Sequence, residues 1–233
     1  MKKLRVNRKS LITNKTTILN CSKILLPLIP SWKNTFKRSI NELSIISDLI
    51  EKRKIHDEYY YPDTRDIFKA FELTPLNKVR VVIFDTDPQT TGLCYSILKK
   101  DDRPTNSLNN IFKELNRVYN DYKNNNDLTY WALQGVLLLS ISLTYPKNKP
   151  KGHFEYFLWM PFIVKVLEDI SKVRPNCIYI LWGKDVEIIK DYILGNPHIL
   201  EYPKSLKSGI LGCNHFIMVN DILKQLNEQQ IRW

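Results

Sequence analysis

The sequence contains no long uninterrupted apolar segment. A membrane-spanning helix needs about 20 consecutive, mostly apolar residues. The longest candidate, residues 24–30, is short and contains Pro27 and Pro30. We therefore expect a soluble protein with no membrane partner. The length of 233 residues suits one globular domain with a substantial core.

Cysteine is scarce and does not follow a metal-binding pattern. The four cysteines, Cys21, Cys94, Cys177 and Cys213, show no C-x-x-C spacing and no accompanying pair of histidines. This argues against a zinc site, and a disulfide framework is not indicated in a chain of this size. We expect reduced thiols in an intracellular protein, whether nuclear, cytoplasmic or mitochondrial, and no cofactor.

Acidic residues are absent from the first 41 positions. Ten Lys and Arg residues lie there, and they account for all but one of the eleven net positive charges. The charge therefore belongs to an N-terminal arm, residues 1–31, more than to the body, residues 32–233. Three interpretations of the arm stay open: a phosphate-binding segment, a targeting sequence, and a poorly ordered solubilising tail.

Apolar residues recur at helical spacing in some segments and form short continuous runs in others. Buried strands are predicted at residues 78–84, 135–141 and 177–183. Helices are predicted at residues 32–55, 63–71, 106–119, 157–173, 185–194 and 215–226. This alternation predicts a single α/β domain with a parallel sheet covered on both faces.

Ligands of such sheets bind beyond the carboxyl ends of the strands. The loops that follow the three predicted strands are residues 85–92, residues 140–152 and the stretch after Gly183. We therefore expect the functional site at these loops.

A series of short motifs is more specific than the fold class. In chain order they are DIFKAFELTP at 66–75, VRVVI at 79–83, DP at 87–88, GLCYS at 92–96, SLNNIFKEL at 107–115, DLT at 127–129, WALQGVLLL at 131–139, LT at 143–144, LWG at 181–183, GCNHF at 212–216 and IRW at 231–233. In this order and at these spacings the chain resembles family 1 uracil-DNA glycosylases from about residue 32 to residue 233. The resemblance implies a central parallel four-stranded sheet flanked by helices.

The resemblance also implies a chemistry and a partner. Uracil must leave the base stack and enter a closed pocket, because its glycosidic bond cannot be reached inside a duplex. In that pocket an aromatic ring stacks on the base and an amide side chain reads its edge. A carboxylate orients water, and a histidine stabilises the departing uracil. The implied partner is DNA, single- or double-stranded, into which a loop inserts a leucine.

The pocket positions match this pattern only in part. Asp87 matches the catalytic, water-orienting aspartate, although Asp-Pro is also a common turn opener. Gln89 stands in place of a tyrosine that excludes thymine, and Tyr95 in place of the stacking phenylalanine. Ser140 replaces the base-reading asparagine, and a hydroxyl cannot present the paired donor and acceptor of an amide. The loop from Asp87 to Gly92 is about five residues shorter than the family pattern.

The DNA-contacting positions are altered in the same partial way. Leu206 matches the inserted leucine, whereas Tyr202 replaces the catalytic histidine. His198 is either a substitute for that histidine or, more commonly for such a residue, a packing side chain. Ser107 matches a phosphate-contacting serine. Phosphate contacts are also predicted for Lys204, Ser205, Lys207 and Ser208, whose alternative is an ordinary solvated loop.

Three hypotheses follow. The first is a catalytically degenerate homologue that binds DNA, a replication or repair partner such as a polymerase, or both. Loss of the base reader and of the leaving-group stabiliser, each worth a few kcal/mol of barrier, supports it. The second is an active glycosylase of base excision repair with altered base specificity that uses Asp87. The third is a pure protein-interaction module, which the near-neutral body favours.

Overall fold

The computed structural model describes residues 29–54, 60–97, 103–146, 154–204 and 209–233. The predicted arm, residues 1–31, lies outside these ranges except for its last three residues. Those three join the body, because Ile29 is buried and the Ser31 hydroxyl accepts a hydrogen bond from the Leu76 N–H (3.0 Å).

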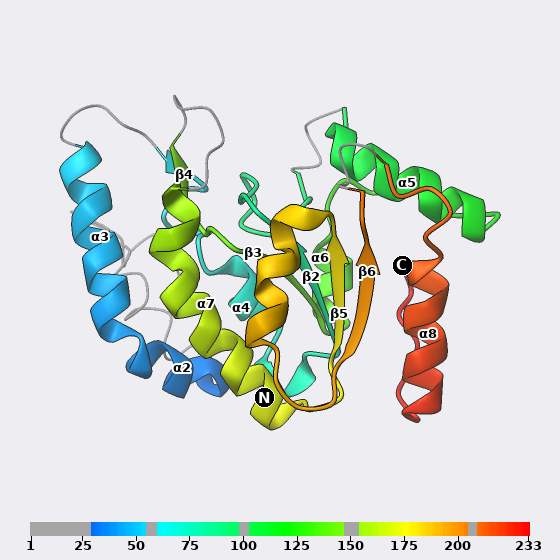
Figure 1. The fold of residues 1–233 in the computed structure, drawn as a ribbon. Helices are drawn as coiled ribbons and strands as arrows, with labels where there is room; N and C mark the ends of the chain where they lie inside the picture. The colour runs from blue at the N-terminus through cyan, green and yellow to red at the C-terminus, as the bar shows by residue number, and fades with distance from the viewer. Residues whose placement is uncertain (1–28, 55–59, 98–102, 147–153, 205–208) are drawn as a thin grey trace, which may run out of the picture.

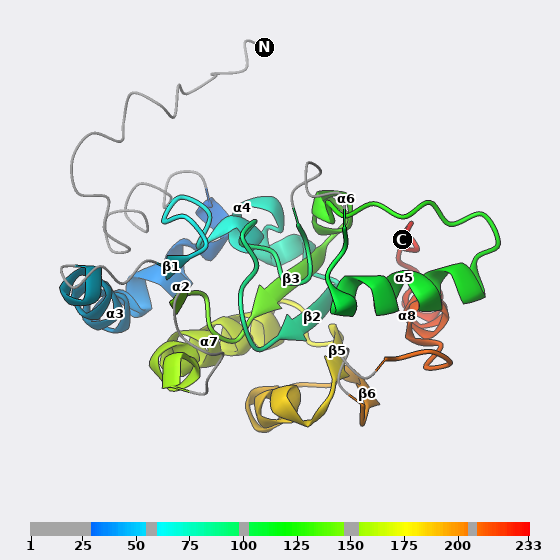
Figure 2. The same ribbon diagram turned by 90° about the horizontal axis from the view of Figure 1, so that it is seen from above.

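Four parallel strands form the central sheet in the order β3–β2–β5–β6. The strands are β2 (Val81–Asp85), β3 (Val136–Ser140), β5 (Ile178–Trp182) and β6 (His198–Tyr202). Figure 2 shows α7 (Phe154–Val173) on one face of the sheet and α5 (Asn106–Val118) with α8 (His215–Gln225) on the other. The predicted α/β domain with a flanked four-stranded parallel sheet is confirmed.

Shorter elements complete the domain (Figure 1). They are η2 (Pro30–Trp32), α2 (Lys33–Arg38), α3 (Ile40–Lys54), β1 (Tyr60–Tyr61), α4 (Lys69–Leu73), η3 (Leu76–Lys78), α6 (Thr129–Leu133), β4 (Tyr145–Pro146) and η4 (Lys184–Tyr192). Strands β1 and β4 pair antiparallel as a separate two-stranded sheet. Within the described residues, no helix is long and apolar enough to cross a membrane.

Burial explains which strands the sequence reveals. Every residue of β3 and β5 is buried, as are the first four of β2, so their sequences are continuous apolar runs. Strand β6 lies at the edge of the sheet, and only its central residue, Leu200, is buried. Because several of its positions are polar or exposed, β6 does not form a continuous apolar run in the sequence.

An aromatic cluster anchors the N-terminal helices to the body. Phe36 of α2 lies edge-on to Phe68, Phe71 and Phe162, with ring centroids 5.0–5.5 Å apart. This arrangement places the positive edge of one ring against the negative face of the next. The Trp32 indole N–H also donates to the Thr74 carbonyl (2.9 Å). The segment from Ile29 through α2 therefore packs onto the core of the domain.

Three helix predictions need correction. The helix predicted at 32–55 is broken at Ser39, whose hydroxyl donates to the Thr35 carbonyl (2.8 Å), a bond that competes with regular helix pairing. The helix predicted at 63–71 begins only at Lys69, because Asp63 accepts the Arg65 N–H (3.2 Å) in a local turn. The helix predicted at 185–194 is the 3-10 helix η4.

Candidate nucleic-acid site at the carboxyl edge of the sheet

The predicted pocket residues lie along the carboxyl edge of the sheet, which is the upper edge in Figure 1, with Ser140 at the end of β3 and Tyr202 at the end of β6 on opposite sides. Asp85, the last residue of β2, lies in register with Ser140, the last residue of β3. Trp182 ends β5 in register with Tyr202, which ends β6. Because all four strands are parallel, the loops that carry Asp87 and Lys204 leave the sheet at this same edge.

Hydrogen bonds tie the loop that carries Asp87 to the end of β3. The Ser140 hydroxyl, on a residue that is only 5% exposed, donates to the Asp87 carbonyl oxygen (3.2 Å). The Ser142 N–H donates to the Thr86 carbonyl (3.0 Å), which extends the pairing of the two strands into the loop. The Asp85 carboxylate accepts the Thr86 N–H (2.8 Å). The backbone around Asp87 is thereby fixed, while Asp87 itself stays partly exposed.

The same loop closes tightly over the end of β2. Gln89, which is partly exposed, accepts the Gly92 N–H at its carbonyl oxygen (3.0 Å). Gly92 has φ +73°, and a Cβ on it would lie 1.8 Å from the Asp66 carbonyl oxygen. Only glycine combines this backbone conformation with so close an approach.

Tyr95 lies buried beneath this loop. Its hydroxyl donates to the Phe84 carbonyl oxygen (2.8 Å), which supplies the partner that a buried tyrosine needs. Its ring lies 6.1 Å from the Trp182 ring at a tilted angle. Burial and the negative charge of Asp85 raise the pKa of Tyr95 well above its usual value, so the hydroxyl stays protonated and keeps this bond.

Tyr202 stands edge-on to His215, with ring centroids 6.2 Å apart. The Trp182 indole N–H donates to His215 Nδ1 (3.1 Å), so a neutral imidazole carries its proton on Nε2. Burial lowers the pKa of His215 to about 4, which keeps the ring neutral at pH 7. His198, in contrast, is the first residue of β6 and lies at the opposite end of that strand.

A buried carboxylate organises the chain at residues 212–214, just before α8. Glu114 of α5 is fully buried and accepts the N–H groups of Gly212 (2.7 Å) and Asn214 (2.8 Å). The Arg117 guanidinium donates to both of its carboxylate oxygens (2.7 and 2.9 Å). Although burial acts in the opposite direction, these bonds leave the pKa of Glu114 below its usual value. Glu114 therefore fixes the start of α8, where His215 lies.

The predicted DNA-contacting residues are described only in part. Ser107 is the second residue of α5 and is half-buried. Thr105 caps the start of this helix, because its hydroxyl accepts a hydrogen bond from the Leu108 N–H (3.2 Å). Lys204 is exposed just beyond β6. Ser205, Leu206, Lys207 and Ser208 lie outside the described residues.

Several residues of this edge escaped the sequence analysis. Asp85 adds a second carboxylate beside Asp87. Its position at the end of an apolar run is the sequence feature that could have identified it. Tyr145 is a second such residue. Burial and the negative charge of Asp87 raise its pKa. His215 was visible only within the motif at 212–216. Among the described residues, no group of His, Cys, Asp and Glu side chains could hold a metal ion.

Known proteins resemble this chain over most of its length. No family model matches it. A uracil-DNA glycosylase of Pseudomonas fluorescens (strain Pf0-1) is 33% identical, over 89% of this chain and 95% of its own length. That of Proteus mirabilis is 36% identical, over 81% and 88%, and that of Yersinia pestis (strain Pestoides F) is 40% identical, over 74% and 80%. The chain belongs to the uracil-DNA glycosylase family.

Solved structures of the family share its fold. The mimivirus uracil-DNA glycosylase superposes with a TM-score of 0.74 at 20% identity, over 92% of this chain and 90% of that chain. The Nitratifractor salsuginis UNG gives a TM-score of 0.59 at 18% identity, over 92% and 96%. A mimivirus UNG variant in complex with UGI gives 0.76 at 19% identity, over 96% and 97%. The whole described body, and not one motif-bearing segment, therefore has the architecture of the family.

Proposed function

We propose that this chain is a DNA-binding member of the uracil-DNA glycosylase family that has lost efficient uracil excision. One observation carries the proposal: the only proton of the Ser140 hydroxyl is donated to the Asp87 carbonyl oxygen. At the position that matches the family's base-reading asparagine, the hydroxyl can then still accept a hydrogen bond but has no further proton to donate. A base edge that offers both a donor and an acceptor then finds a partner for its donor but none for its acceptor.

The replacement of the leaving-group stabiliser supports the same conclusion. Tyr202 stands at that position on the motif match. The neighbouring histidine, His215, is buried and lies edge-on to Tyr202. Its Nδ1 accepts a hydrogen bond from the Trp182 indole N–H. A donor aimed at the developing negative charge is typically worth about 3 kcal/mol of barrier. Losing both this donor and the base reader is expected to slow uracil release by several orders of magnitude.

DNA binding rests on features that do not depend on the pocket. Ser107 at the start of α5 and Lys204 beyond β6 are predicted to contact phosphates, together with Ser205, Lys207 and Ser208, and Leu206 is predicted to enter the base stack. The arm, residues 1–31, adds positive charge that would strengthen the binding at low salt. A replication or repair protein, such as a polymerase, is the proposed further partner.

The test measures uracil release and DNA binding in the same samples. We expect uracil-containing single- and double-stranded DNA to be bound without measurable release. Restoring the family residues in the double variant Ser140→Asn, Tyr202→His is expected to raise release, and adding Asp87→Asn should abolish that gain. Release by the unmodified chain that disappears in Asp87→Asn would contradict the proposal and establish an active glycosylase.

A third candidate, a module that binds only proteins, is tested with a truncated chain. The truncation should remove residues 1–28 and keep Ile29, which is buried in the core. We expect salt-dependent DNA binding to persist in this variant. If all binding disappears with the arm, the body does not bind DNA and the protein-interaction role becomes the better account.

A further inference from the structure

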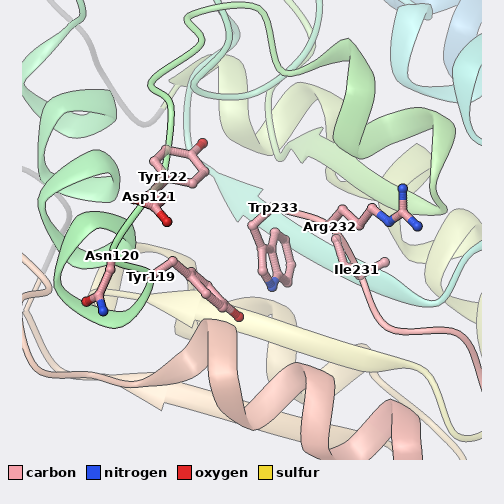
Figure 3. A pocket seen from close by; sticks show the side chains of 7 residues that line it. All are labelled: Tyr119, Asn120, Asp121, Tyr122, Ile231, Arg232 and Trp233. Atoms are coloured by element: carbon pink, nitrogen blue, oxygen red, sulfur yellow. The ribbon is translucent and has the colours of Figure 1, made fainter.

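A hollow lined by aromatic side chains lies between the loop that follows α5 and the C-terminal segment. It has a volume of about 490 Å³, and Tyr119, Tyr122 and Trp233 form its apolar walls. Figure 3 shows Tyr119 and Tyr122 on the loop that follows α5, and Trp233 on the C-terminal segment across from them. Asn120 and Asp121, both exposed, add polar groups at its rim. The hollow thus combines flat apolar rings with a few hydrogen-bonding groups.

The segment that carries Trp233 is held in a defined conformation. Asn220 both donates to the Ile231 carbonyl (3.0 Å) and accepts the Ile231 N–H (2.8 Å). Gln134 makes the same pair of bonds to Arg232 (2.7 and 2.8 Å). The Trp233 indole N–H donates to the Phe216 carbonyl (3.1 Å), and its ring packs edge-on to Trp131, 5.1 Å away. Little ordering is therefore needed when a ligand binds here.

Arg232 links this hollow to a second, basic groove. The groove has a volume of about 780 Å³ at the amino-terminal edge of the sheet, and Arg232 lines both cavities. In Figure 3 the Arg232 guanidinium points away from the tyrosines. Lys78, Arg80 and Arg174 supply the other positive charges of the groove. The two cavities therefore form one surface on either side of residues 228–233.

Most of these charges lack an acidic partner. Arg174 pairs with Glu228. Arg80 instead donates to the carbonyl oxygens of Gln134 and Gln229, and Glu228, the acidic residue that lines the groove, also acts on its charge. Within the described residues, neither Lys78 nor Arg232 forms an ion pair, and both side chains are exposed. The groove therefore presents three positive charges that an anion could neutralise.

We infer that this surface, which we name the flank site (Lys78, Arg80, Tyr119, Tyr122, Arg232 and Trp233), binds single-stranded nucleic acid. Proteins that bind single strands without sequence preference combine aromatic stacking platforms with a cationic groove for the backbone. Bases of a duplex are not free to enter such a hollow. The inference goes beyond the proposed function, since the flank site is separate from the carboxyl edge of the sheet.

The distribution of charge favours a nucleic acid over an acidic peptide. Asp121 stands at the aromatic hollow, whereas the uncompensated cations stand in the groove. A nucleotide separates its neutral base, whose edge can donate to Asp121, from its anionic phosphate. An acidic peptide with an aromatic side chain would carry its charge close to the ring, where Asp121 repels it.

The first experiment measures binding of a fluorescent 16-mer oligothymidylate to the full chain over a series of salt concentrations. The double variant Lys78→Ala, Arg232→Ala is expected to bind at least tenfold more weakly. Its salt dependence, as log K against log salt, should be shallower by about 1.4, since each lost phosphate contact on a single strand contributes about 0.7. The matched control is Lys37→Ala, Lys52→Ala, which removes two exposed lysines of α2 and α3 and should change neither quantity.

The second experiment locates the bound strand. Oligothymidylate carrying 5-iodouracil is irradiated with the full chain, and mass spectrometry maps the crosslinks. Crosslinks to Tyr119, Tyr122 or Trp233 are expected. Crosslinks confined to residues 1–31 or to the carboxyl edge, together with unchanged binding by the groove variant, would overturn the inference. So would a polyglutamate peptide that binds through Lys78 and Arg232 while the oligonucleotide does not. Duplex binding, measured in parallel, should survive the groove substitutions, which separates this test from that of the proposed function.

Discussion

Replacing Glu114 with glutamine probes the link between α5 and the start of α8. Each carboxylate oxygen of Glu114 accepts one backbone N–H and one guanidinium N–H: Oε2 from Gly212 and Arg117, and Oε1 from Asn214 and Arg117. A glutamine in either orientation keeps one oxygen and turns an NH₂ group toward the other two donors. One backbone hydrogen bond is lost, and a buried N–H faces another donor.

The cost follows from these contacts. A hydrogen bond to a charged group contributes about 1.5–3 kcal/mol, and an unsatisfied buried donor costs a similar amount. The Arg117 guanidinium is partly exposed, and water therefore weakens its share of the interaction. We therefore expect Glu114→Gln to lower the free energy of unfolding by about 3 kcal/mol. For a domain of this size that corresponds to a fall in Tm of roughly 6–12 °C.

The assay is urea and thermal unfolding, with Glu201→Gln as the matched control. Glu201 pairs with Lys190 (2.8 Å), but both side chains are more than a third exposed. Exposed pairs contribute little, so the control should change stability by less than about 0.5 kcal/mol. If the Glu114 variant unfolds with the same midpoint as the control, the buried carboxylate does not hold the two segments together and the reasoning fails.

Other perturbations give further expected outcomes. Burial lowers the pKa of His215 from about 6.5 to about 4, so between these values the unfolded chain binds a proton that the folded chain does not. Stability should therefore fall as pH drops from 6.5 to 4, by up to about 3 kcal/mol, and His215→Gln should flatten this part of a urea-midpoint profile against pH. Tyr95→Phe removes the 2.8 Å bond to a β2 carbonyl and should cost about 1 kcal/mol in urea unfolding. Gly92→Ala should lower Tm far more than Gly212→Ala: both glycines have positive φ, but only at Gly92 would a Cβ meet the Asp66 carbonyl, at 1.8 Å.

The central strands could be predicted from the sequence because they are buried on both faces. The apolar runs at 78–84, 135–141 and 177–183 match the ends of β2, β3 and β5 to within one to three residues. Strand β6 has no such run, since its edge position exposes Glu201 and leaves His198 and Tyr202 half-buried. The motif resemblance implied a fourth strand, but only the structure located it.

Local side-chain bonds account for the misplaced helix ends. Ser39 interrupts a segment whose apolar spacing is otherwise continuous, because its hydroxyl bonds back to the Thr35 carbonyl. Asp63 begins the helix predicted at 63–71, yet it closes a turn with Arg65 and the observed helix begins six residues later. Hydrophobic spacing says nothing about either bond.

The location of the candidate site could be predicted from the sequence, but its side-chain hydrogen bonds could not. The loops at the carboxyl ends of the strands could be predicted from the fold class alone, and Asp87, Ser140 and Tyr202 lie there. The bond from Ser140 to the Asp87 carbonyl could not, because a sequence does not reveal which acceptor a hydroxyl chooses. The bond from Trp182 to His215 joins residues 33 positions apart and depends on how α8 packs.

Retention of the fold is compatible with the proposed loss of uracil excision because different residues are responsible for each. Gly92 and Glu114 are needed where backbone approaches backbone or where buried N–H groups need an acceptor, so changes there threaten folding. Ser140 and Tyr202 stand at strand ends, where neither side chain supplies a buried backbone N–H of the described residues with its acceptor. Under the proposed function, substitutions at these two positions reduce excision without disturbing the fold. For the same reason, the double variant Ser140→Asn, Tyr202→His should fold with little loss of stability, so a failure to regain uracil release would reflect chemistry and not unfolding.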